Sequence, residues 1–271
     1  MSPSTNLLSA APTAARILFA CALLLVTPRI VVAGAWLMPP GAGQIIAGTA
    51  FSGSARAFDA QGRLVPVPSY QKFELGAYVE YGLTDWATLV ATPSYDRISQ
   101  PAPAVPYSGI GQSGLGARFG LYHTDALVFS AQGLLASPGA SFNGNLQPHR
   151  AASLDLRAMA GYNFTLGAAA AFLDAEAAYR LYAQAQPGEW KFDVTFGVRP
   201  IANWLVLMQS FGSLQPGQAE GFPQSWWEKL QGSVVYDFNS VWSAQIGVFM
   251  TVAGKNTGRE LGPVGAIWYK F

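Results

Sequence analysis

The sequence predicts an all-β fold, a transmembrane antiparallel up-and-down β-barrel of about 12 strands with short periplasmic turns and longer extracellular loops. Three observations predict it: low charge, no apolar stretch of spanning-helix length beyond the N-terminus, and alternating apolar and polar residues. Only 11% of the 271 residues are charged and 51% are apolar, whereas soluble domains carry about 25% charged residues. A membrane chain without a spanning helix must satisfy its backbone hydrogen bonds in a closed barrel.

The N-terminus has the pattern of a secretory leader. Arg16 precedes an apolar run over 17–26, and the small residues at Val31-Val32-Ala33 form a cleavage pattern. We predict a signal peptide over 1–33, with cleavage after Ala33 or, as the alternative, after Ala35. An N-terminal periplasmic or plug segment would then cover 34–42, and the outer-membrane barrel 43–271. The only cysteine lies in the leader, so the mature chain would have no disulfide, catalytic thiolate or cysteine-bound metal.

Period-two alternation identifies the strands. In the clearest one, 190–199, Trp190, Phe192 and Val194 share one face with Phe196 and Val198, and polar residues or Gly occupy the other. The alanine-rich stretch 167–182 could form a helix, but its alternation favours a strand. Twelve strands are expected to begin near residues 43, 70, 86, 113, 126, 152, 170, 190, 203, 226, 242 and 261. Long loops are expected at 54–69, 99–112, 138–149, 183–189, 212–224 and 254–260, with short turns between them.

The C-terminal strand ends on aromatic residues in alternation. Ile267, Tyr269 and Phe271 form the predicted barrel-insertion signal, which the barrel-assembly machinery of the outer membrane would read. Other aromatic residues concentrate near predicted strand ends, as interfacial girdles beside membrane lipid require. Both features favour a bacterial outer-membrane location.

Charged residues on the predicted strands fall on the face opposite the apolar one. An Arg or Lys facing lipid at mid-membrane would cost about 2–4 kcal/mol, so these side chains are expected to point into the barrel lumen. One interpretation is an ion-pair network that fills the lumen, and the other is a polar track that guides a solute. The predicted lumen-facing side chains are Glu74, Glu80, Arg118, Asp155, Arg157, Asp174, Glu176, Arg180, Lys191, Asp193, Arg199, Lys229, Asp237 and Lys270.

Catalytic, metal and cofactor sites are not predicted, and neither is nucleic-acid binding. The formal net charge is +1, and removing Arg16 and Arg29 with the leader makes it −1, which gives no support for binding nucleic acid. The G-x-G-x-x-G sequence at 109–114 lacks the strand before it and the helix after it that a dinucleotide site needs. His149 with Ser141 could be imagined as a nucleophile pair, but no G-x-S-x-G sequence supports an enzyme.

Several stretches together resemble the outer-membrane family associated with the meta-pathway of phenol degradation. They are GAWLMPPG at 34–41, YQKFE at 70–74, EYGLTD at 80–85, FDVTFGVRP at 192–200, NWL at 203–205 and QSFG at 209–212. The resemblance covers most of the mature chain, although these are strand and turn signatures. It implies a barrel connected with uptake of aromatic or other small organic compounds.

Two functional hypotheses remain open. The first is an outer-membrane channel or facilitator for passive passage of small solutes, including aromatic or other hydrophobic compounds, with 34–41 folded into the lumen as a plug. The second is a structural or surface-interaction barrel with a closed lumen. An outer-membrane lipid-modifying enzyme is the third and least supported. A soluble β-sandwich or lipocalin-like barrel would have too few charged residues for its surface.

Overall fold

A closed antiparallel β-barrel is the fold of the chain in the computed structural model, which describes residues 34–102, 104–142, 151–183, 186–217 and 222–271. The predicted leader, 1–33, lies outside the described residues. In the described part, no helix is long and apolar enough to cross a membrane. The strands are β1 (Gly43–Phe58), β2 (Leu64–Thr84), β3 (Ala87–Thr92), β4 (Ser94–Ser99), β5 (Tyr107–Ile110), β6 (Gly114–His123), β7 (Leu127–Ala136), β8 (Ala140–Ser141), β9 (Ser153–Leu166), β10 (Ala169–Tyr182), β11 (Glu189–Ile201), β12 (Trp204–Gln215), β13 (Ser225–Asp237), β14 (Trp242–Lys255), β15 (Thr257–Gly258) and β16 (Leu261–Lys270).

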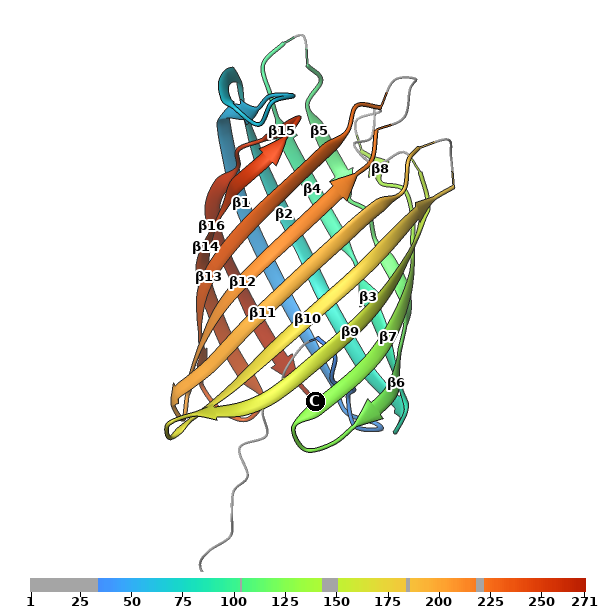
Figure 1. Ribbon diagram of the computed structural model, residues 1–271, viewed down its shortest axis with the longest axis vertical. Coiled ribbons are helices and arrows are strands. Elements are labelled where there is room, and N and C mark those ends of the chain that lie inside the picture. The colour runs from blue at the N-terminus through green and yellow to red at the C-terminus, as the bar shows by residue number, and fades with distance from the viewer. Residues whose placement is uncertain (1–33, 103, 143–150, 184–185, 218–221) are drawn as a thin grey trace, which may run out of the picture. The chain divides into compact units, whose positions relative to one another are not determined.

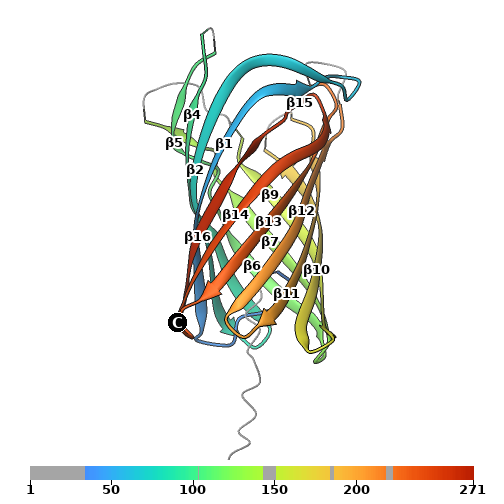
Figure 2. The same ribbon diagram turned by 90° about the vertical axis from the view of Figure 1, so that its left-hand side faces the viewer.

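Twelve wall strands make up the barrel, because four of them are interrupted and each counts as two elements. The pairs β3 with β4, β5 with β6, β7 with β8 and β15 with β16 each follow one line of the wall. The barrel closes where β1 pairs with β2 on one side and with β16 on the other. Figures 1 and 2 show the tilted strands, with short turns and the C-terminus at one end and long connections at the other. The predicted fold class is confirmed.

Alternation predicted the strand positions well, but it placed the first long loop wrongly. Residues 54–69 were expected to be a loop, whereas β1 continues to Phe58 and β2 begins at Leu64. Prolines at 66 and 68 suggested a loop. Pro66 is accommodated where the register shifts between Ser54 and Arg56 in β1, since a bulge tolerates a missing backbone donor. The loops expected at 99–112, 212–224 and 254–260 are also shorter than predicted, because β5, β12, β14 and β15 extend into them.

The outer surface of the wall is apolar. Its exposed side chains include Leu75 on β2, Leu89 on β3, and Ile246 and Val248 on β14. Aromatic rings contact one another around the short-turn end, including Tyr81 with Phe271, Trp86 with Phe119, Tyr162 with Phe164, Trp204 with Tyr236 and Trp242 with Tyr269. An apolar band edged by aromatic side chains is the surface that a bilayer requires.

Candidate functional site

Residues 34–42 lie inside the short-turn end of the barrel, where they are hydrogen-bonded to strands on several sides. The Ala35 N–H donates to Asp174 Oδ1 on β10 at 2.8 Å, and Arg118 Nη1 on β6 donates to the Trp36 carbonyl at 2.8 Å. The Met38 N–H donates to Thr88 Oγ1 on β3 at 2.9 Å. This N-terminal segment therefore bridges parts of the wall that are not neighbours in the sheet.

An apolar cluster inside the lumen adds packing to these hydrogen bonds. Ala35 is fully buried with Val128 and Met159, and Trp36 packs against them. The Trp36 ring meets Phe172 edge-on with centroids 5.8 Å apart. A Cβ atom at Gly161 would lie 2.5 Å from the Trp36 ring, so glycine at this position is what lets the indole approach the wall. Close packing therefore holds the segment against the wall, in addition to the hydrogen bonds.

Arg118 and Glu80 form a buried ion pair beside the segment. Arg118 Nη1 lies 2.6 Å from Glu80 Oε1, and both side chains are essentially inaccessible, at 0% and 1% exposure. Gln44 donates to the other Glu80 oxygen at 2.6 Å, and Gln132 and Tyr78 accept from the guanidinium. Removing two charges from water is costly, and this full set of partners offsets that cost. The pair joins β2 to β6 across β3.

A second charged network covers the wall from β9 to β11. Arg157 contacts three carboxylates: Glu176, Asp193 at 2.6 Å and Asp155 at 3.5 Å. Arg180 lies 3.1 Å from Asp155 and 3.9 Å from Glu189. Asp174, next to Glu176 on the same face of β10, is 2% exposed and accepts the Ala35 N–H.

Smaller charged groups lie at the two ends of the barrel. At the short-turn end, Arg199 lies 2.7 Å from Asp237, which is 3.8 Å from Lys270. At the loop end, Lys72 lies 2.7 Å from Glu74, and Lys229 contacts Glu260.

Lys191 behaves differently from the other predicted lumen residues. In the described ranges it has no carboxylate within 4.0 Å, although Glu189 and Asp155 act on it electrostatically. Apart from Lys191 and Asp174, each charged residue predicted for the lumen lies within 4.0 Å of a group of opposite charge. Whether these side chains act on a solute stays a prediction.

The opposite side of the lumen holds a cavity of about 480 Å³, where Glu74 is the one charged residue of a lining that is otherwise uncharged. Small residues on β1 and β2, Gly48 and Gly76, leave the space open, and Gln231 and Gln245 line it from β13 and β14. Gln112 closes the side nearest the second network, where its Oε1 accepts from Arg180 at 3.0 Å. The lumen is therefore filled by charged side chains on one side, and has free space with few charged side chains on the other.

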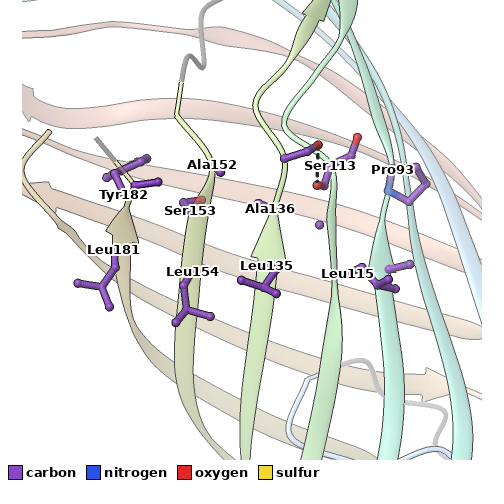
Figure 3. A pocket seen from close by; sticks show the side chains of 14 residues that line it. Pro93, Ser113, Leu115, Leu135, Ala136, Ala152, Ser153, Leu154, Leu181 and Tyr182 are labelled. Carbon is purple, nitrogen blue, oxygen red and sulfur yellow. Dashed lines mark hydrogen bonds between the residues drawn. The ribbon is translucent and has the colours of Figure 1, made fainter. Parts of the chain in front are cut away.

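A second cavity, of about 760 Å³, opens in the wall where several strands break at one level (Figure 3). β3 stops before Pro93, β7 ends at Ala136, and β9 begins at Ser153. Figure 3 shows Leu115, Leu135, Leu154 and Leu181 in a row along one edge of it. Side chains repair part of the ladder: Ser113 Oγ accepts the Ser94 N–H at 3.0 Å, and Thr92 Oγ1 the Gly114 N–H at 3.0 Å. The cavity is large enough for a small-molecule ligand, and its lining is mainly apolar.

The predicted insertion signal forms part of the barrel seam. Phe271 exchanges backbone hydrogen bonds with Gly43 at 2.8 and 3.0 Å, and its ring stacks with Tyr81 and Tyr269. Ile267 is paired with Ala47 on β1 and is about half exposed on the outer face. Recognition of these residues by assembly machinery stays a prediction.

Sequence reasoning missed the uncharged polar partners of the lumen charges. Gln44, Tyr78, Thr88 and Gln132 complete the hydrogen bonds around Arg118 and the docked segment. Their alternation with apolar neighbours was visible in the sequence, but only charged residues were considered as lumen candidates. His149, one member of the imagined nucleophile pair, lies outside the described residues.

Comparison with known proteins finds its matches among solved structures. No family model matches the chain. No curated protein matches it either. An outer-membrane channel from Pseudomonas putida F1 is similar at a TM-score of 0.70 and 17% identity, covering 89% of this chain and 99% of that one. The KdgM porin, solved with disordered oligogalacturonate, is similar at 0.53 and 7%, covering 84% and 99%. The NanC porin is similar at 0.50 and 10%, covering 83% and 100%.

The fold is that of an outer-membrane β-barrel. At these identities the likenesses show the fold alone.

Proposed function

We propose that this chain is a narrow outer-membrane channel for passive passage of small solutes, with residues 34–42 as a plug. The observation that carries the proposal is the position of this segment. It lies in the lumen, and its hydrogen bonds reach Thr88 and Arg118 on the paired strands β3 and β6 and Asp174 on β10, which is not their neighbour in the sheet. A barrel with a purely structural role would need no such side-chain sockets. The cavity of about 480 Å³ on the other side gives the solute space.

Export to the outer membrane fits the same proposal. The apolar outer band with its aromatic edge suits a bilayer, and the leader predicted over 1–33 would carry the chain across the inner membrane. The aromatic C-terminus would direct it to the barrel-assembly machinery. The fold shared with the Pseudomonas putida channel and the two porins supports this location.

Small aromatic or other hydrophobic compounds are the solute class that we propose. The wall cavity supports it, because an apolar lining of Leu and Ala at a break between strands can accept a molecule that would not remain in a polar pore. The resemblance to the phenol meta-pathway family points the same way. The wall cavity is also lined by Ser153 and Tyr182, whose hydroxyl groups would meet a phenolic hydroxyl.

The test is planar-bilayer conductance of the refolded chain from Gly34, compared with a chain that begins at Ala42. We expect brief or small current steps from the longer chain and larger, more stable steps from the deletion. Far-UV circular dichroism and detergent extraction would establish that both are folded and inserted. If both folded proteins are silent, the lumen is closed and the structural barrel replaces the channel. Equal conductance would show that the segment is no plug.

Solute class is tested separately by uptake of phenol and of a sugar of similar size into liposomes. Faster uptake of phenol than in protein-free liposomes, together with slow sugar uptake, is expected. A preference for the sugar would contradict the proposed class and leave the channel intact.

A further inference from the structure

Asp174 is a buried acid without a basic partner in the described part of the chain. Its side chain is 2% exposed, and it contacts the backbone N–H of Ala35 and the carboxyl group of Glu176. Glu176, two residues along the same face, adds a second acid and no positive charge. Arg118 acts on Asp174 electrostatically but already pairs with Glu80, and Arg157 already contacts Glu176, Asp193 and Asp155. A buried, uncompensated carboxylate is costly, so a missing positive charge is expected here.

The surrounding network has the same imbalance. On β9 to β11, apart from Arg199 with its own partner Asp237, five acids face three bases, which leaves two negative charges. The acids are Asp155, Asp174, Glu176, Glu189 and Asp193, and the bases are Arg157, Arg180 and Lys191.

Gly34 lies directly against this unpaired carboxylate. A Cβ atom on Gly34 would be 2.5 Å from the Asp174 Cγ and 2.6 Å from both carboxylate oxygens. The Gly34 nitrogen is bonded to the same Cα, about 1.46 Å away. It is therefore placed beside the acid, and a side chain at position 34 would displace the carboxylate.

We propose that leader cleavage supplies the missing charge, and that the α-ammonium of mature Gly34 pairs with Asp174 and Glu176 to lock the plug. Hydrolysis of the Ala33–Gly34 bond consumes one water. The Ala33 carbonyl leaves as a carboxylate with the leader, and the Gly34 nitrogen, formerly a neutral amide, becomes an ammonium ion at neutral pH. Processing thus converts an unfavourable acid pair into an anchor. The inference rests on the proposed plugged channel and on cleavage at the predicted site.

The same geometry chooses between the two predicted cleavage sites. Cleavage after Ala35 would remove the Ala35 N–H that donates to Asp174. The new N-terminus would then be at Trp36, one residue beyond Ala35. Cleavage after Ala33 keeps that hydrogen bond and adds the ammonium. The intact mass of the exported protein is therefore expected to correspond to a chain beginning at Gly34. A chain beginning at Trp36 would overturn the proposal.

The lock is tested with a single thiol, which the cysteine-free mature chain allows. The substitution Ala35→Cys places it at a fully buried position, and a maleimide reports how often the segment leaves its socket. Three forms of this refolded protein are compared: a free Gly34 amine, an α-amine acetylated after folding, and Asp174→Asn. Asp96→Asn, at another buried acid on β4, is the matched control.

Acetylation and Asp174→Asn are each expected to raise the labelling rate at least about tenfold, the change that 1.4 kcal/mol produces. Together they should raise it no further than either alone, because both remove the same ion pair. Asp96→Asn should leave the rate unchanged. Since acetylation follows folding, a folding defect cannot mimic its effect.

An unchanged labelling rate after acetylation would overturn the lock. Fully additive effects would also overturn it, because they would show that the amine and Asp174 act independently. The proposed channel function is judged separately, by the conductance of the chain that begins at Ala42. If that deletion conducts better while acetylation has no effect, the plug stands and the lock fails.

Discussion

The two sides of the lumen differ in how far side chains fill them and in how many of those side chains are charged. From β6 to β11 the lumen is filled by the N-terminal segment, the Arg118–Glu80 pair and the Arg157 network. From β13 round to β2 it is lined mainly by small and uncharged side chains, with Glu74 as the one charged residue, around a cavity of about 480 Å³. Glutamine side chains there bond to neutral neighbours, as Gln231 does to Gln209 at 2.9 Å and Gln245 to Ser233 at 2.8 Å.

This difference shows where the barrel is rigid and where it can carry a solute. Apart from Asp174 and Lys191, the charges on the filled side have partners on other strands, so moving one strand breaks ion pairs. On the other side, neutral amides can exchange a hydrogen bond with a neighbour for one with water or a passing molecule at low net cost. We therefore expect substitutions on the filled side to change stability and gating, and substitutions on the open side to change permeation.

The largest effect on the filled side is expected from Arg118→Ala. It leaves Glu80 buried without its partner, which costs about 3–5 kcal/mol when a buried pair is broken, and it removes the donor to the Trp36 carbonyl. The measurement is the free energy of unfolding by urea in liposomes, together with conductance, which should rise as the segment loosens.

The double substitution Glu80→Gln with Arg118→Met is the control for that prediction. It removes both charges, so its cost should be smaller than that of Arg118→Ala alone. An equal or larger cost would show that the side chains matter by volume and not as an ion pair.

Gly161→Ala should have the next largest effect. Its new Cβ would lie 2.5 Å from the Trp36 ring, and overpacking of this kind costs about 1–3 kcal/mol. The segment can escape the clash by undocking, so higher conductance is expected with little change in barrel stability. Gly232→Ala is the matched control, because nothing lies within 4 Å of its Cβ position. Equal conductance in the two variants would contradict docking at Trp36.

Sequence periodicity could predict the wall but not these contacts. Alternation placed Glu80, Arg118 and Asp174 on strands at sites that prove buried, because a charge on the lipid side is so costly. It could not show that Arg118 pairs with Glu80 across an intervening strand, since that depends on the tilt and register of the closed sheet. Nor could it place Trp36 against Gly161. The apolar character of 34–41 suggested a plug, but the wall residues that hold it can be identified only from the three-dimensional packing.

The open side is tested by filling it. Gly48→Leu puts a large side chain into the 480 Å³ cavity, where a Cβ on Gly48 meets its neighbours at ordinary distances of 3.5 and 3.6 Å. Conductance of the chain that begins at Ala42 should fall, with little change in unfolding free energy. Val248→Leu, on the exposed outer face of β14, is the control and should conduct normally. Unchanged conductance in Gly48→Leu would move the path elsewhere in the lumen.

The smallest effect is expected outside the membrane, at the turn between β1 and β2. The backbone N–H of Arg63 donates to the Asp59 carboxylate at 2.9 Å and, with the Gln61 N–H, holds the pKa of Asp59 below its usual value. Because the folded pKa is depressed, this contribution to turn stability is present above the unfolded pKa of about 3.9 and is lost as pH falls through the folded pKa. At neutral pH, Asp59→Asn should speed amide hydrogen exchange at Gln61 and Arg63, with conductance unchanged. Exchange as slow as in the unsubstituted chain would show that the carboxylate charge does not order the turn.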